Sequence, residues 1–92
     1  MRFTWDDKKA ASNLAKHGVS FRDAVRIFDG EIVEWIDGRF AYDEERWSAI
    51  GLLESKEIFV VYVEKKAGLR RLISARLATR REREIYWREV SR

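Results

Sequence analysis

Residues 58–64, with the sequence IFVVYVE, decide the fold of this 92-residue chain. Every residue of the stretch before the final glutamate is β-branched or aromatic. A run of this length and composition is typical of a strand that is buried on both of its faces. We therefore predict that it forms the central strand of a sheet, around which the other elements pack.

The neighbouring elements should follow one another closely, because the chain has no proline and no Gly/Ser-rich linker. Besides the central strand, we expect strands at 2–5, 31–36, 46–53 and 70–76. Helices are expected at 6–17, 20–28 and 78–90. The strands at 31–36 and 46–53 are joined through a turn at Asp37-Gly38 and a loop at 42–45, and the central strand is followed by a turn at 65–68. The order β-α-α-β-β-β-β-α predicts an α+β fold in a single domain spanning 1–92, with helices packed on one face of an antiparallel sheet.

The helix ends carry recognisable capping residues. Asp6 has the position of an N-cap, and Gly18 that of a left-handed residue just beyond a helix. Ser20 and Asp23 have the spacing of a capping box. These signals predict two separate helices in the first third of the chain.

The composition excludes several classes of site. A hydrophobic content of 46% with 13% aromatic residues is enough for a core without disulfides, and the chain has no cysteine. With one histidine and no evident carboxylate cluster, we expect no metal site and no other cofactor. No signal peptide or membrane-spanning stretch is visible, so a cytoplasmic protein without membrane contacts is expected.

Charge is distributed unevenly along the chain. Residues 29–57 contain nine acidic and three basic side chains, whereas residues 70–92 contain eight arginines, three glutamates and no lysine. Arginine is favoured over lysine where phosphate is bound through several hydrogen bonds. The basic end therefore indicates a polyanionic partner, although a solvated helix face explains the same composition equally well.

Two stretches together resemble a known family. They are WDDKKAASNLAKHGVSFRDAVRIF at 5–28 and RRLISARLATRREREIY at 70–86, with ERWSAIGLL at 45–53 in register between them. The chain resembles the BrnT toxins of bacterial type II toxin–antitoxin modules over nearly its whole length. The acidic stretch at 31–45 is the least similar part.

The resemblance implies a RelE-like fold and a metal-independent ribonuclease that inhibits translation and arrests growth. It implies neutralisation by a BrnA-like antitoxin with a ribbon-helix-helix domain, so that operator DNA is bound only through the antitoxin. RNA, free or as ribosome-associated mRNA, would be the substrate. A homodimer and a toxin–antitoxin heterotetramer both stay open.

The candidate catalytic residues are Arg76, Arg46, Arg71 and His17. Arg76 ends the last strand within the family-like ISAR sequence and is the first choice for stabilising the phosphate; the alternative is an ion pair with the acidic middle segment. Arg71 and Arg76 would point to opposite faces of a regular strand, whereas Arg70 and Arg76 would share a face, unless a bulge intervenes. One of Arg71 and Arg76 is therefore expected to be structural.

Arg46 opens the strand at 46–53 and could reach the same face, or form a salt bridge with Glu44 or Glu45. His17 has the unperturbed pKa nearest to neutral among the side chains, but at a helix end it more often caps or packs. The remaining residues expected to contact RNA are Arg70, Arg80, Arg81, Arg83, Lys9 and Lys16. Glu82 and Glu84 interleave with these arginines and would weaken their grip on RNA.

Two other functions remain open at this point. One is a non-catalytic toxin homologue that binds with its antitoxin at promoter DNA as a co-repressor. The other is a plain subunit whose open sheet face pairs with a partner.

Overall fold

The computed structural model describes residues 1–37 and 44–92. Its elements are β1 (Arg2–Thr4), α1 (Asp7–His17), α2 (Phe21–Ala24), the 3-10 helix η1 (Val25–Asp29), β2 (Val33–Asp37), β3 (Arg46–Leu53), β4 (Lys56–Lys66), β5 (Leu69–Leu77) and α3 (Arg80–Val90). The predicted α+β order is confirmed, with η1 replacing the second half of the helix expected at 20–28. Gly38 of the expected turn, and residues 42 and 43 of the expected loop, lie outside the described residues.

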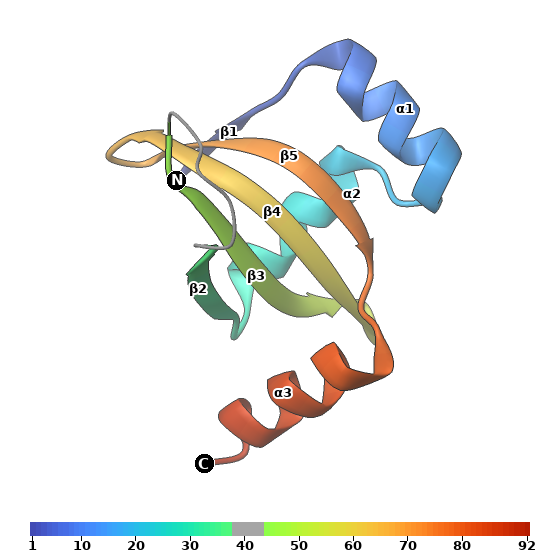
Figure 1. The fold of residues 1–92 in the computed structure, drawn as a ribbon, viewed down its shortest axis with the longest axis vertical. Helices are drawn as coiled ribbons and strands as arrows, with labels where there is room; N and C mark the ends of the chain where they lie inside the picture. The colour runs from blue at the N-terminus through green and yellow to red at the C-terminus, as the bar shows by residue number, and fades with distance from the viewer. Residues whose placement is uncertain (38–43) are drawn as a thin grey trace.

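The sheet has the strand order β1-β5-β4-β3-β2, so β4 is central, as its apolar sequence predicts. Figure 1 shows β2 to β5 following one another as neighbours, and each of these pairs is antiparallel. Strand β1 instead runs parallel to β5. The sheet is therefore mixed rather than wholly antiparallel, because β1 and β5 are distant in sequence and no hairpin dictates their relative direction.

One face of the sheet carries the larger core. Buried residues of α2, η1 and the strands meet there: Val19, Phe21, Ala24, Ile27, Ala49, Ile58, Val60, Tyr62, Leu72 and Ala75. Helix η1 approaches β3 closely at Gly51, where an added Cβ would lie 2.8 Å from the Ile27 Cβ. Helices α2 and η1, from the N-terminal half of the chain, cover this face.

Asn13 fastens α1 to the part of β5 that extends beyond β1. Its side-chain amide donates to the Ala75 carbonyl at 2.8 Å and to the Val19 carbonyl at 3.0 Å. Its oxygen accepts from the Ala75 amide at 3.1 Å. The buried Asn13 side chain thus satisfies backbone groups of β5 that would otherwise lack partners.

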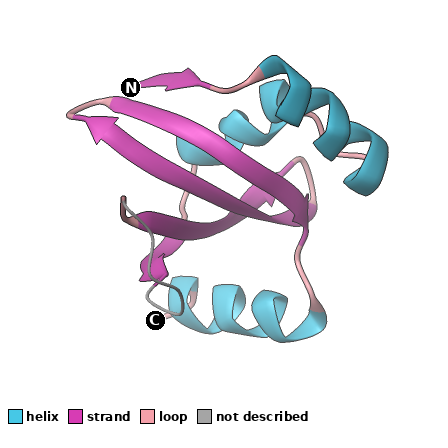
Figure 2. Cartoon of the chain, turned by 45° about the horizontal axis from the view of Figure 1, so that its top comes forward, coloured by secondary structure: helices cyan, strands magenta, loops and turns pink. Residues whose placement is uncertain are grey.

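Helix α3 lies on the opposite face of the sheet from α1 and α2 (Figure 2). A second cluster of buried residues holds it there, formed by Ile50, Phe59, Ala78 and Tyr86. The expectation that all helices cover one face does not hold in this detail. The reason is that β3 and β4 are apolar on both faces, so the second face also needs cover.

The predicted caps are present. Asp6 Oδ1 accepts from the Lys9 amide and Ser20 Oγ from the Asp23 amide, both at 3.0 Å, and Gly18 has a φ of 73°. In the described part of the chain, no helix is long and apolar enough to cross a membrane.

Candidate functional site

A bulge in β5 determines which arginines share a face. Val61 of β4 pairs with Ser74, but the next residue, Tyr62, pairs with Leu72, which leaves Ile73 without a partner. The extra residue reverses the alternation of side chains along the strand. Arg71 therefore lies on the same face as Arg76, and Arg70 lies on the other, which reverses the arrangement expected for a regular strand.

Arg46 belongs to the same face as Arg71 and Arg76, since it alternates along β3 with the α3-side residue Ile50. The register of β3 with β4 ends at the pair Trp47–Tyr62, so that Arg46 follows one residue beyond it, toward Val63, which is the partner of Arg71. The backbones of Arg46 and Arg71 are thus roughly 10 Å apart, on either side of β4. We call the α3 side of the sheet that bears Arg46, Arg71 and Arg76 the arginine face.

Arg76 forms one wall of a hollow on the arginine face. The hollow has a volume of about 200 Å³ and is lined by Trp35, Ser48, Phe59, Arg76 and Glu82. The Arg76 guanidinium carbon lies 4.3 Å from the centroid of the Phe59 ring. Its Nη1 and Nη2 donate to the two carboxylate oxygens of Glu82, at 2.8 and 3.0 Å. Among the described residues, Arg76 is therefore paired with Glu82 of α3 rather than with the acidic middle segment.

The acidic segment instead meets the arginine face at Arg71. Glu44 lies 3.6 Å from Arg71 and accepts a hydrogen bond from Lys65 at 2.9 Å. The pKa of Glu44 is lowered, first by this hydrogen bond and then by the charges of Lys65, Arg71 and Arg46. The Arg71 side chain remains accessible to solvent, with 38% of its surface exposed.

Arg70 has a different environment on the core face. Its guanidinium carbon lies 5.0 Å from the ring centroid of Phe28 and 4.6 Å from that of Tyr62. It also lies 3.9 Å from Glu34, and the Tyr62 hydroxyl donates to the same carboxylate. Burial and this hydrogen bond raise the pKa of Tyr62. Arg70 is separated by the sheet from the hollow that contains Arg76.

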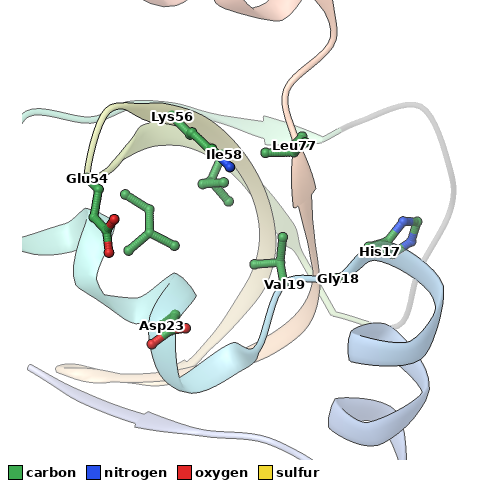
Figure 3. A pocket seen from close by; sticks show the side chains of 9 residues that line it. His17, Gly18, Val19, Asp23, Glu54, Lys56, Ile58 and Leu77 are labelled. Carbon is green, nitrogen blue, oxygen red and sulfur yellow. The ribbon is translucent and has the colours of Figure 1, made fainter.

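His17, Lys9 and Lys16 lie at the edge of β5. They line a hollow of about 210 Å³ with Ile73 and Ser74. His17 also borders a cavity of about 220 Å³, in which its ring lies beyond Val19, away from the carboxylates of Asp23 and Glu54 (Figure 3). None of the three arginines of the arginine face lines either space.

The arginines of α3 differ in their contacts. Arg80 is 88% exposed and lies 3.4 Å from Glu84, and Arg81 is exposed. Arg83 donates to the Ala78 carbonyl at 3.1 Å. The buried Tyr86 packs in the second cluster and donates from its hydroxyl to the Glu31 carbonyl at 3.0 Å. Trp87 is half exposed and donates to Glu57 at 2.7 Å.

Glu82 is a part of this site that the sequence did not reveal. It was expected only to weaken RNA binding, whereas its carboxylate contacts Arg76 directly. The spacing of Thr79 and Glu82 is that of a capping box, and this signal would have fixed the start of α3 next to Arg76. Within residues 1–37 and 44–92, no group of three or more His, Cys, Asp or Glu side chains could hold a metal ion.

Comparison with known proteins agrees with the resemblance found in the sequence. Residues 5–82 match a family model described as the ribonuclease toxin, BrnT, of type II toxin–antitoxin systems. The fold is similar to the crystal structure of the Brucella abortus ribonuclease toxin BrnT, with a TM-score of 0.66 and 28% sequence identity. That match covers 87% of this chain and 99% of the other. No curated protein matches the chain. Because the family model spans most of the sequence, the chain belongs to the BrnT family of ribonuclease toxins of type II toxin–antitoxin systems.

Proposed function

We propose that this protein is an endoribonuclease that cleaves RNA without a metal ion and thereby inhibits translation and growth. The observation that carries the proposal is the arginine face. Arg46, Arg71 and Arg76 come from two strands to one side of the sheet, where Arg76 borders a hollow that is open to solvent. Such a surface suits a chain of phosphates more than a small neutral ligand.

Metal-free cleavage of RNA needs few groups. The ribose 2′-hydroxyl attacks the adjacent phosphate in line, and the crowded, negatively charged intermediate must be stabilised. We assign this role to Arg76, since Phe59 and Glu82 hold its guanidinium at the wall of the hollow. Arg46 and Arg71 lie toward the same end of β4, four residues along it from the partner of Arg76, and would bind phosphates on one side of the bond that is cut.

Trp35 offers a surface for an RNA base beside the same hollow. Its side chain is 37% exposed, and its ring lies 6.1 Å from that of Phe59. Stacking of a base on an aromatic ring adds affinity with little dependence on sequence. The proposed substrate is therefore single-stranded RNA whose bases can leave their own stack.

The other predicted RNA-binding residues receive more distant roles. His17, Lys9 and Lys16 line a separate hollow, so we assign them contacts with the RNA backbone and no proton transfer at the Arg76 hollow. We assign Arg80, Arg81 and Arg83 the same kind of contact from α3. Arg70, buried between two rings, stabilises the fold.

The family name places this protein in a toxin–antitoxin pair, which implies an antitoxin partner. We propose that the antitoxin is BrnA-like, with a ribbon-helix-helix domain, and that operator DNA is contacted only through it. The second candidate function is a non-catalytic co-repressor. The pairing of Arg76 with Glu82 and of Arg71 with Glu44 favours it, because both contacts reduce the positive charge offered to RNA.

Induced expression in a bacterial host tests the proposal, with wild type beside Arg76→Ala and with growth and transcript integrity followed together. We expect growth arrest with RNA cleavage for the wild type, and loss of both for the well-expressed variant. The purified wild type should also cleave RNA in the presence of a chelator. Normal growth and intact RNA with soluble wild-type protein would overturn the ribonuclease proposal and favour the co-repressor function.

A further inference from the structure

We propose that Glu82 is a positioning residue for the cleavage reaction, holding the Arg76 guanidinium in the orientation that binds the phosphate. The inference rests on the proposed function, in which Arg76 stabilises the transition state. Glu82 itself need not touch the RNA, because its contacts are with Arg76 and with the start of α3.

Glu82 is itself held in place by the capping box at the start of α3. Its Oε1 accepts from the Thr79 amide at 2.8 Å, while its own amide donates to the Thr79 hydroxyl at 3.2 Å. The same Oε1 accepts from Arg76 Nη1, and Oε2 accepts from Arg76 Nη2. The orientation of Arg76 is thus fixed by backbone and side-chain groups that the helix has already ordered.

The contact with Glu82 leaves one edge of Arg76 available. Nη1 donates to Glu82 and to the Leu77 carbonyl, and Nη2 donates to Glu82. The Nε–H and the second hydrogen of Nη2 lie on a different edge and have no partner among the described residues. A guanidinium edge with two parallel N–H groups binds phosphate through two hydrogen bonds. Glu82 therefore orients Arg76 without blocking it.

The burial of Arg76 and Glu82 and the ionisation of Glu82 agree with a positioning role for Glu82. The side chains of Arg76 and Glu82 are 33% and 18% exposed. Burial opposes ionisation of Glu82, but hydrogen bonds from Arg76 and from Thr79 outweigh it and lower its pKa. Phe59 covers one side of the guanidinium. An arginine restrained on these sides loses little further freedom when the transition state forms, which favours the rate of reaction.

Two substitutions separate the orientation of Arg76 from the stability of α3. Glu82→Gln keeps the capping box, in which glutamine also functions, but loses the charged double contact with Arg76. Thr79→Ala removes the hydroxyl cap and destabilises α3, but leaves the hydrogen bonds between Arg76 and Glu82. The probe is a short single-stranded RNA containing a bond that the wild type cleaves, with kcat, KM and unfolding midpoint measured for each protein.

We expect Glu82→Gln to lower kcat by roughly 10- to 100-fold with KM within about threefold of wild type, because the loss is one of geometry in the transition state. Thr79→Ala should lower the unfolding midpoint but lower kcat far less than Glu82→Gln does, because the amide of residue 79 still donates to Glu82. Added to Arg76→Ala, Glu82→Gln should cause no further loss, because its effect acts through Arg76.

Three results would overturn the inference while the proposed function stands. They are full or increased activity of Glu82→Gln, a further loss when it is added to Arg76→Ala, and a fall in kcat for Thr79→Ala equal to that for Glu82→Gln. If the wild type does not cleave RNA, or if Arg76→Ala cleaves as the wild type does, the proposed function fails and the inference fails with it.

Discussion

Arg70 and Arg76 lie on the same strand, and each contacts an aromatic ring and a glutamate, yet their surroundings differ. Arg70 lies between Phe28 and Tyr62 near Glu34, and 13% of its side chain is exposed. Arg76 contacts the Phe59 ring and opens onto a hollow, with 33% of its side chain exposed. The cover on each face of the sheet, and not the residue type, therefore decides whether an arginine can meet a ligand.

The two faces are covered to different extents. The Arg70 face is closed by α1, α2 and η1, which share a continuous core with the sheet (Figure 1). In the described part of the chain, the Arg76 face is covered by α3, which packs against β2 and β3. An enzyme of the ribonuclease class needs an accessible face for its substrate, and in the described residues the arginine face meets this need.

The largest expected effect distinguishes the two arginines by function. Arg76→Met should lower the rate of RNA cleavage roughly 100- to 1,000-fold, as does the loss of a donor that stabilises a transition state. Arg70→Met should leave cleavage per folded molecule within a few-fold of wild type but cost about 1–2 kcal/mol of unfolding free energy, through lost ring contacts. Methionine keeps an apolar stem in both variants.

Cleavage assays and urea unfolding on the same preparations of Arg76→Met and Arg70→Met measure the two effects. Equal losses of cleavage in the two variants would mean that the faces do not have separate roles.

A smaller difference in unfolding free energy is expected between the residues that attach a helix to each face of the sheet. Asn13→Ala leaves the Ala75 amide and carbonyl without their partner and should cost about 2–3 kcal/mol. Tyr86→Phe removes only the hydrogen bond to the Glu31 carbonyl and should cost about 1 kcal/mol. Urea midpoints of the two variants test the order. A costlier Tyr86→Phe would show that α3 is the more firmly attached helix.

The smallest effect is the pH dependence that Glu82 contributes. The folded pKa of Glu82 lies below its ordinary value of 4.5, so the stabilisation is present above that pH and is lost as pH falls through the folded pKa. Between about pH 7 and pH 3, wild type should therefore lose more unfolding free energy than Glu82→Gln. Denaturant unfolding at both pH values measures the difference, and parallel losses would exclude the contribution of Glu82.

Much of the fold follows from local sequence. The caps at Asp6, Gly18 and Ser20, and the central position of residues 58–64, depend on interactions within a few residues or on composition alone. The family assignment also follows from the sequence, because the family model matches residues 5–82, which include the first stretch quoted above and most of the second. The placement of α3 does not follow from the sequence, because α3 could have packed on either apolar face of β4.

The site itself depended on contacts that no local pattern contains. The sequence by itself determined that arginines cluster near the end of the chain, and that a strand and a helix meet at Arg76. Only the tertiary structure decided that Arg71 shares a face with Arg76, because the bulge at Ile73 arises from the pairing of β5 with β4. It likewise decided that Glu82 contacts Arg76. The physical reason is that a capping residue acts on its own helix, whereas the face of a strand residue depends on a register set by a distant partner.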